Sequence, residues 1–353
     1  MQEFLSRSLN RKNITRGFVF FGLCTVVGLC ASFLWSGTQD LGTHILSMRG
    51  KFILLAGLCM LTDWLLGGAR IHIFCRKMTT GLTFYDSIRA NLSTICVGGI
   101  TPFQAGGVGH IYICSRVGVP VAGCITAGII SFTGTLMFLF LAAAYVAVHA
   151  PDFVPSEITR VSRYTLLMFS LFLSFFLLMV VKPKVFLIPL TLMRFPDRRG
   201  FHFASNLLNR LVTTLDKLIT DHATYTRMFI TDHKGICVVN FLCTAGIYAS
   251  RFTGGYVIVR ALGGDAPFWH VIAIQSILHF VTLFAPSPGA AGIAEVLTVI
   301  FMGNLLVGHT GGLYSLLTRF FTTYCGVIVG GIVLVSQLAK DLDWQSSKVT
   351  QAK

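Results

Sequence analysis

Two long hydrophobic stretches of this chain are interrupted at their centres by proline and glycine. The first break is residues 101–110 (TPFQAGGVGH), and the second is residues 285–295 (APSPGAAGIAE). In lipid, irregular backbone leaves N–H and C=O groups without partners, so it persists only where protein or a water-filled cavity surrounds it. About half of the 353-residue chain separates the two breaks. Matched interruptions in the two halves of a chain are typical of the binding site in a transporter-like fold.

The composition indicates a membrane protein. Hydrophobic residues make up 54% of the sequence, charged residues make up 12%, and the mean hydropathy is +0.73. Soluble domains carry about 25% charged residues. The apolar runs are long and do not alternate with polar residues, which favours helices over the strands of a membrane barrel. We therefore predict an all-α, polytopic membrane protein.

The net charge of +14 comes from 28 Lys and Arg against 14 Asp and Glu residues. Such an excess is typical of cytoplasmic loops, which collect basic residues next to anionic headgroups. No basic segment with interleaved aromatic residues is present, so nucleic acid is excluded as a partner. The ten cysteines contain no C-x-x-C pair. We therefore predict no metal site and expect the cysteines to act as small buried hydrophobes.

The hydrophobic segments follow one pattern twice. After a first span at about 17–35, the order of span, broken hairpin and span at about 51–149 recurs at about 236–338. Each half of a broken segment is too short to cross about 30 Å of hydrocarbon, so we predict two re-entrant hairpins. The Lys and Arg bias places both termini in the cytoplasm, and the two hairpins then open from opposite sides. The expected architecture is an inverted repeat within a single domain, residues 1–353.

Two polar segments are assigned to the cytoplasm. The basic cluster at 70–77 (RIHIFCRK) follows the second span, and a longer polar stretch covers about 182–234. Leucines recur at helical spacing within 201–230, which predicts an amphipathic helix that packs on the bundle or lies in the membrane interface.

Glycine and proline at the two breaks are the first candidate substrate-binding residues. Glycine permits positive φ and close approach of the backbone, and proline ends helices. The half-helix after each break presents free N–H groups and the positive end of its dipole, which suit a phosphate or carboxylate. The alternative is that these glycines only allow close helix packing. The candidates are Pro102, Gly106, Gly107, Pro286, Pro288, Gly289 and Gly292.

Polar side chains inside hydrophobic segments are the second group of candidates. A charge at the centre of a membrane helix costs about 2.5–3.5 kcal/mol on insertion scales, so each needs a partner or water. Glu295 either caps the helix after the second break or binds a cationic group. Arg319 either holds a lipid phosphate or pairs with Glu295. The remaining candidates are Asp63, Gln104, His110, Arg251 and His279, and for each histidine a helix–helix contact is the alternative.

Motifs of catalysis are absent. The sequence contains no nucleophile elbow, no H-E-x-x-H zinc motif, no Walker motif and no dinucleotide fingerprint. We therefore assign no catalytic residue and no cofactor, and whether the chain is an enzyme stays open.

The two breaks also resemble a known family. Residues 101–107 (TPFQAGG), 112–120 (YICSRVGVP) and 286–295 (PSPGAAGIAE), with Arg319 beyond them, are similar to the lysylphosphatidylglycerol synthase transmembrane-region family. This family is the flippase-like membrane part of the bacterial multiple peptide resistance factor, and it also includes stand-alone proteins. The resemblance extends over about residues 15–340. It implies a protein of the bacterial inner membrane that translocates lipid between leaflets, and glycolipid assembly is another association of the family.

The sequence departs from the family pattern at two places. Family members often carry Glu directly after the first Gly-Gly pair, where this sequence has Val108. The full-length synthase also has a soluble, aminoacyl-tRNA-dependent transferase domain after its membrane part. This chain ends about fifteen residues past its last predicted span, so we do not expect it to synthesise lysyl-lipid.

We predict a transporter of the lipid flippase type that binds membrane phospholipids and exposes a headgroup site to each leaflet in turn. Two alternatives stay open. An enzyme acting on a lipid-linked substrate requires Asp63, His279 and Glu295 to converge on one cavity. A non-transporting partner of a separately encoded lipid- or glycan-modifying enzyme would dock through residues 201–230. The sequence predicts neither the lipid, the energy source, the direction nor the oligomeric state.

Overall fold

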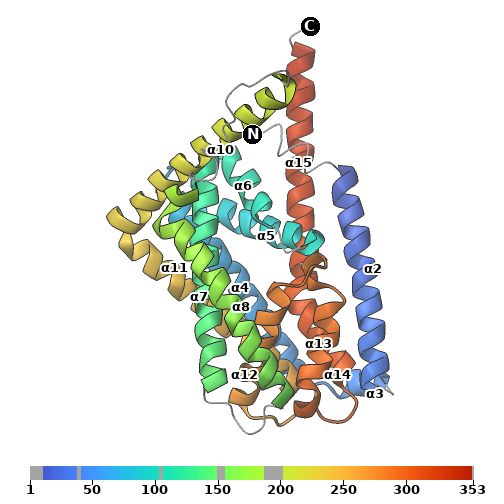
Figure 1. The fold of residues 1–353 in the computed structure, drawn as a ribbon. Helices are drawn as coiled ribbons and strands as arrows, with labels where there is room; N and C mark the ends of the chain where they lie inside the picture. Colours follow the sequence, from blue (N-terminus) through green and yellow to red (C-terminus); the bar gives the residue numbers. More distant parts are fainter. Residues whose placement is uncertain (1–10, 38–40, 103–105, 149–155, 187–201, 352–353) are drawn as a thin grey trace.

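The computed structural model describes residues 11–37, 41–102, 106–148, 156–186 and 202–351, which are helical apart from short turns. Figure 1 shows a bundle in which α2 stands along one side and α10 lies obliquely across the end from which α15 projects. The all-α prediction is confirmed. The helices are α2 (Arg11–Ser36), α3 (Leu41–Ser47), α4 (Gly50–Cys75), α5 (Phe84–Ile100), α6 (Gly107–Arg116), α7 (Val121–Val148), α8 (Ser156–Val181), α10 (His202–Arg227), α11 (Lys234–Ala261), α12 (Phe268–Leu283), α13 (Ile293–Met302), α14 (Gly311–Arg319) and α15 (Cys325–Gln351).

Within the described residues, six segments are long and apolar enough to cross a membrane. Large apolar side chains on their outer faces are exposed, among them Val26, Val27 and Leu34 of α2. Such a surface suits hydrocarbon and not water. The segments are Ile14–Ser36, Gly50–Cys75, Val121–Val146, Lys234–Ala261, Pro288–Leu305 and Gly311–Asp341.

The first break separates α5 from α6. The helix α5 begins with a capping box, in which Thr83 Oγ1 accepts from the Asp86 N–H at 3.1 Å and Asp86 Oδ2 accepts from the Thr83 N–H at 3.2 Å. It ends at Ile100, because Thr101 is extended at φ −114°, ψ 145°. The chain then turns back along α5, and a Cβ added at Gly109 would lie 2.4 Å from the Ser93 carbonyl oxygen. Glycine is therefore needed here for close packing.

The second break lies between α12 and α13. Gly289, Ala290 and Gly292 all have positive φ, at 55°, 58° and 84°. Side chains with a Cβ are strained in this region, which explains why two of the three residues are glycines. A short 3₁₀ turn at Pro288–Ala290 precedes α13. Both breaks were predicted at these positions from proline and glycine alone.

The helix α2 packs directly on the second break. A Cβ added at Gly28 would lie 2.4 Å from Gly292 Cα, whereas nothing lies within 4 Å of a Cβ added at Gly22 on the same helix. We expect Gly28→Val to lower the free energy of unfolding in detergent by about 1–3 kcal/mol, because overpacking forces backbone to move. Gly22→Val is the matched control and should unfold like wild type. Equal thermal unfolding of the two variants would contradict this packing.

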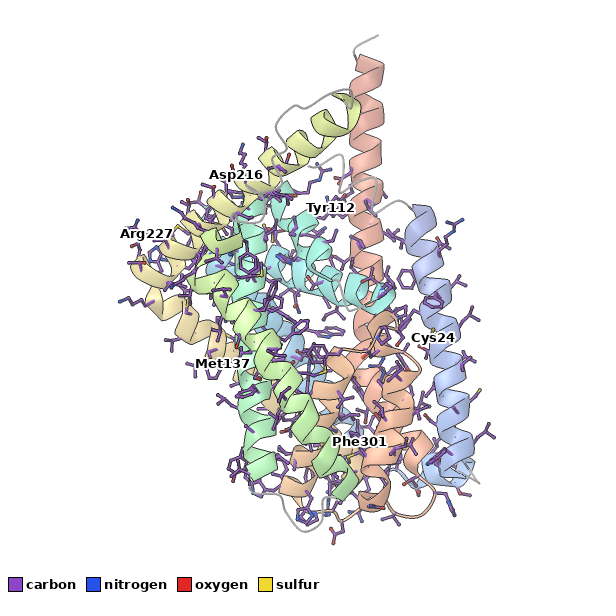
Figure 2. The ribbon with its side chains drawn as sticks, viewed as in Figure 1. Cys24, Tyr112, Met137, Asp216, Arg227 and Phe301 are labelled. Carbon is purple, nitrogen blue, oxygen red and sulfur yellow. The ribbon has the colours of Figure 1, made fainter. Side chains whose placement is uncertain are left out.

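The hairpin of α5 and α6 is tied to α15 by polar contacts at the end of the bundle where α10 lies. Tyr112 and Arg116 of α6 both bind the carboxylate of Asp341. Arg89 Nη2 of α5 donates to Gln337 Oε1 at 2.6 Å. Figure 2 shows Tyr112 beside α15, at this end of the bundle.

The predicted amphipathic helix corresponds to α10. Figure 2 shows Asp216 and Arg227 on this helix, on the side away from the bundle. On its inner side His222 is buried, with its Nδ1 2.9 Å from Thr126 Oγ1 and its Nε2 donating to the Met179 carbonyl at 3.2 Å. These contacts hold α10 against α7 and α8.

Docking of α10 should weaken in acid. Burial lowers the pKa of His222 below its ordinary value of 6.5, so the unfolded or undocked state binds more protons as the pH falls. The docked position of α10 therefore has its full stability above about pH 6.5 and loses stability progressively below that pH. We expect hydrogen exchange in residues 212–227 to accelerate between pH 7.5 and 5.5, after correction for intrinsic rates. The same acceleration in His222→Gln would contradict this cause.

Candidate functional site

A cavity of about 630 Å³ lies beside both breaks. Helices α4, α5, α6, α7, α8, α11, α12, α13 and α14 contribute to its wall, together with the turn of the second break. The volume is in the range of about 300–1,000 Å³ that is usual for ligand sites. The polar and ionisable side chains of the lining include Asp63, Arg70, Asn91, His110, Ser131, Thr135, Tyr248, Arg251, His279, Thr318 and Arg319.

The two breaks lie against each other at this cavity. A Cβ added at Gly289 would be 3.0 Å from the carbonyl oxygen of Gly99, in the last turn of α5. Gly106 approaches α5 just as closely, since its added Cβ would be 2.4 Å from the Thr94 carbonyl oxygen. Backbone from two distant parts of the sequence thereby reaches the same space.

Glu295 and Arg319 form a buried ion pair that fixes the second break. Arg319 Nε lies 2.9 Å from Glu295 Oε1, which also accepts from the Tyr324 hydroxyl at 2.8 Å. Glu295 Oε2 accepts from the Gly292 N–H at 2.6 Å. Arg319 Nη2 donates to the Gly289 carbonyl at 2.7 Å, and its Nη1 donates to Thr323 Oγ1. The pairing of Arg319 with Glu295 and the capping position of Glu295 were both among the predicted alternatives.

Arg251 and Asp63 form a second ion pair across the cavity wall. Arg251 Nε is 3.0 Å from Asp63 Oδ2, and its Nη2 is 3.3 Å from Asp63 Oδ1. This two-point contact joins α11 to α4. The sequence marked both residues as candidates but did not predict that they pair.

Arg70 differs from the other two arginines of the wall. Its guanidinium is held by uncharged acceptors: Nε donates to Asn240 Oδ1 at 3.3 Å, and Nη2 donates to the Ser131 carbonyl at 2.6 Å and to Thr135 Oγ1 at 3.4 Å. Among the residues that the structure describes, no carboxylate lies within 4.0 Å of it. With histidines neutral, and with Arg319 compensated by Glu295 and Arg251 by Asp63, one positive charge is left in excess at the wall.

The other predicted residues divide into two groups. Gly106, Gly107, His110, His279 and Gly289 line the cavity. His110 Nε2 donates to the Cys124 carbonyl at 3.0 Å, and His279 Nδ1 donates to the Gln275 carbonyl at 3.0 Å, so each histidine also makes a structural contact. Outside the lining lie Pro102, Pro286, Pro288, Gly292 and Glu295, whereas Gln104 lies outside the described residues.

The enzymatic alternative requires Asp63, His279 and Glu295 to meet at one cavity, and the structure does not bring all three there. Asp63 and His279 both line the cavity. Glu295 is not part of the lining, its side chain is 0% exposed, and both of its carboxylate oxygens accept hydrogen bonds. Glu295 therefore supplies no reactive group to the cavity.

Sequence reasoning missed Arg70 as a site residue, because the basic cluster at 70–77 was assigned as a whole to the cytoplasm. The structure places Arg70 on the cavity wall. A signal was present: Asp63, Gly67 and Arg70 follow one another at i, i+4 and i+7, so they share one face of α4. All three line the cavity.

Comparison with known proteins agrees with this architecture. The family model described as the lysylphosphatidylglycerol synthase TM region matches residues 19–330, which include both breaks. The chain is also 24% identical over 305 residues to a UPF0104 membrane protein of Archaeoglobus fulgidus, an alignment covering 83% of this chain and 89% of that protein. The resemblance seen in the sequence is confirmed, and this multi-pass membrane protein belongs to the lysylphosphatidylglycerol synthase TM region family.

Proposed function

We propose that the protein is a flippase-type transporter that moves a lipid with a phosphate-containing headgroup between the two leaflets. The observation that carries this proposal is Arg70, an arginine at the wall of a membrane cavity without an acidic partner among the described residues. An uncompensated charge at membrane depth is costly, and such residues mark substrate pathways. An anionic headgroup would supply the missing negative charge.

The hydrogen bonds of Arg70 support phosphate as the ligand. Its Nε and Nη2 are engaged, while its Nη1 has no hydrogen bond to any described residue. The guanidinium is planar and is therefore suited to phosphate oxygens. Its contacts to Asn240 and Ser131 fix the orientation of the plane in advance, which lowers the entropic cost of binding.

We further infer that α5–α6 and α12–α13 are re-entrant hairpins of an inverted repeat, at about 51–149 and 236–338 of one domain. Helix α6 of the first hairpin has 10 residues and helix α12 of the second has 16. They extend about 15 and 24 Å, short of the roughly 30 Å of hydrocarbon. Movement of one hairpin at a time would open the cavity to one leaflet at a time. The resemblance to the family favours the inner membrane of a bacterium, and the excess of basic residues favours cytoplasmic termini.

The proposal is tested in proteoliposomes that contain one fluorescent lipid each: phosphatidylglycerol, phosphatidylethanolamine or an uncharged diacylglycerol. A membrane-impermeant quencher added outside removes only the fluorescence of the outer leaflet. Fluorescent lipid in the inner leaflet is protected until it crosses to the outer leaflet. We expect the protein to accelerate the loss of this inner-leaflet fluorescence for the two phospholipids, compared with protein-free vesicles. No acceleration for either phospholipid would overturn the transport proposal.

A docking role for a separately encoded lipid- or glycan-modifying enzyme is the second candidate. It is favoured by α10, which is amphipathic and lies across the end of the bundle. Deleting residues 202–227 should abolish co-purification of such a partner under this alternative while lipid movement is unaffected. Loss of lipid movement together with the partner would instead place α10 within the transport unit.

A further inference from the structure

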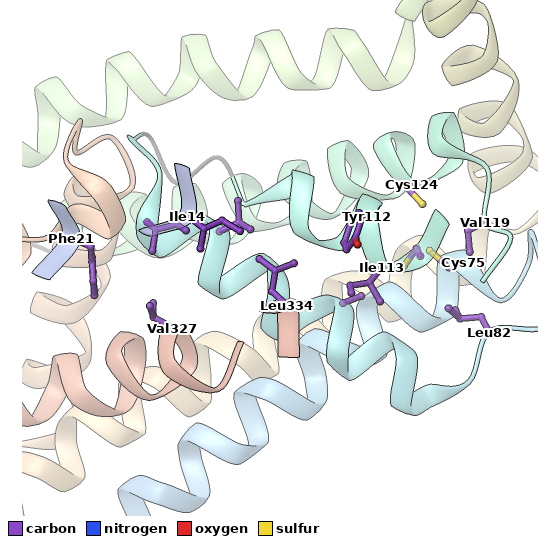
Figure 3. Close-up of a cluster of buried hydrophobic side chains, with 14 of the residues drawn as sticks. Ile14, Phe21, Cys75, Leu82, Tyr112, Ile113, Val119, Cys124, Val327 and Leu334 are labelled. Atoms are coloured by element: carbon purple, nitrogen blue, oxygen red, sulfur yellow. The ribbon is translucent and has the colours of Figure 1, made fainter. Parts of the chain in front are cut away.

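Three buried cysteines meet at one point outside the cavity. Cys75 is the last residue of α4, Cys114 lies in α6 and Cys124 lies in the first turn of α7. Their sulfur atoms all lie within 4.8 Å of one another, and each residue is 0% exposed. All three are free thiols. Figure 3 shows the sulfur atoms of Cys75 and Cys124 among hydrophobic side chains that include Leu82 and Val119.

The spacing of the sulfurs fits a single metal ion. An ion with three metal–sulfur bonds of about 2.3 Å holds its sulfurs about 4 Å apart. Thiolate ligands select soft metals, above all copper(I) and zinc. Zinc in structural sites takes four protein ligands, and the described residues place no fourth His, Cys, Asp or Glu atom in this group. A site of three sulfurs and no fourth ligand favours copper(I).

We propose that Cys75, Cys114 and Cys124 form a binding site for copper(I). Each thiol that coordinates loses one proton to solvent, and the ion remains monovalent because no electron is transferred. The connecting turns at 76–83 and 117–120 lie over the cluster, with Leu82 and Val119 packed against it. An ion can therefore enter by opening these turns, without passing through the bundle.

A bound ion would act on the position of α6. The three ligands belong to three helices, so coordination would clamp α6 between α4 and α7. His110 of α6 lines the cavity and donates to the carbonyl of Cys124, one of the proposed ligands. The metal site is inferred from the thiols alone and does not depend on lipid transport.

The test is anaerobic titration of the full-length, reduced protein with copper(I) supplied as its bicinchoninate complex, followed by measurement of copper per protein after desalting. We expect about one retained ion per chain and a sulfur shell at about 2.3 Å in X-ray absorption. Cys114→Ala and Cys124→Ala should each weaken retention about tenfold or more. Cys96→Ala, which removes an equally buried thiol outside the cluster, should retain copper like wild type.

Four results would overturn the proposal. The first is a wild-type protein that yields all of its copper to the chelator. The second is equal retention by wild type and both cluster variants. The third is a shell of fewer than two sulfurs, and the fourth is a mass decrease of about 2 Da that marks a disulfide within the cluster. The absorption measurement on wild type keeps the test decisive even where a variant folds poorly.

Discussion

Glu295→Ala is expected to lower the free energy of unfolding in detergent by about 3–5 kcal/mol, because it leaves a buried arginine without its partner. Arg319 is 9% exposed, and its charge is compensated by the carboxylate of Glu295. The substitution also leaves the Gly292 N–H and the Tyr324 hydroxyl without their acceptor. The Tm of the purified protein measures the effect.

The chain supplies a matched control for this prediction. Asp86 occupies the same capping position at the start of α5 that Glu295 occupies at the start of α13, but it is only partly buried. Asp86→Ala should cost about 1 kcal/mol, the usual value for a lost cap. Adding Arg319→Leu to Glu295→Ala should recover part of the lost stability, since no unpaired charge then remains. Equal costs for Asp86→Ala and Glu295→Ala would show that the ion pair contributes little.

The positions of the helices can be predicted from the sequence, because charged residues are scarce and lie between the apolar runs. The first break was predicted to begin at residue 101, and α5 ends at Ile100, directly before it. Proline and glycine mark both breaks, because proline ends helices and glycine adopts positive φ and permits close backbone approach. Local rules of chain geometry are sufficient for these features.

Partners across the bundle are much harder to predict. The carboxylate of Asp63 and the guanidinium of Arg251 are 188 positions apart in sequence, and nothing local selects one pairing among several. Glu295 and Arg319 were paired only as one option, because both flank the same break. Which charges neutralise each other depends on helix packing, and that packing determines which arginine remains unpaired.

The cysteine cluster is another contact between distant parts of the chain that the sequence does not predict. Metal motifs are recognised by short spacings such as C-x-x-C, whereas Cys75, Cys114 and Cys124 come from three separate helices. Of these, only Cys114 and Cys124 are near each other in sequence, on either side of the turn at 117–120. The prediction of buried thiols is confirmed for these three and for Cys96 but is wrong for Cys30, which is exposed, and the sequence did not predict that three thiols meet.

Arg70→Gln is expected to slow phospholipid movement about ten- to hundredfold. A hydrogen bond to a charged group contributes about 1.5–3 kcal/mol, and each 1.4 kcal/mol corresponds to a factor of ten. Arg70→Lys should lose less, because it keeps the charge but not the planar arrangement of donors. The proteoliposome assay with fluorescent phosphatidylglycerol measures these rates.

Stability distinguishes a ligand-binding arginine from a structural one. Arg70→Gln should leave the Tm unchanged or raise it, because it removes a partly buried charge that has no acidic partner among the described residues. Arg251→Gln should lower the Tm, since Asp63 would then be buried without its partner. Arg260→Gln, at the exposed end of α11, should change neither Tm nor transport. If Arg70→Gln transported phospholipid at the wild-type rate, the phosphate would have to bind elsewhere in the cavity. If it unfolded instead, Arg70 would be a packing residue of α4, and its three uncharged acceptors would be its complete set of partners.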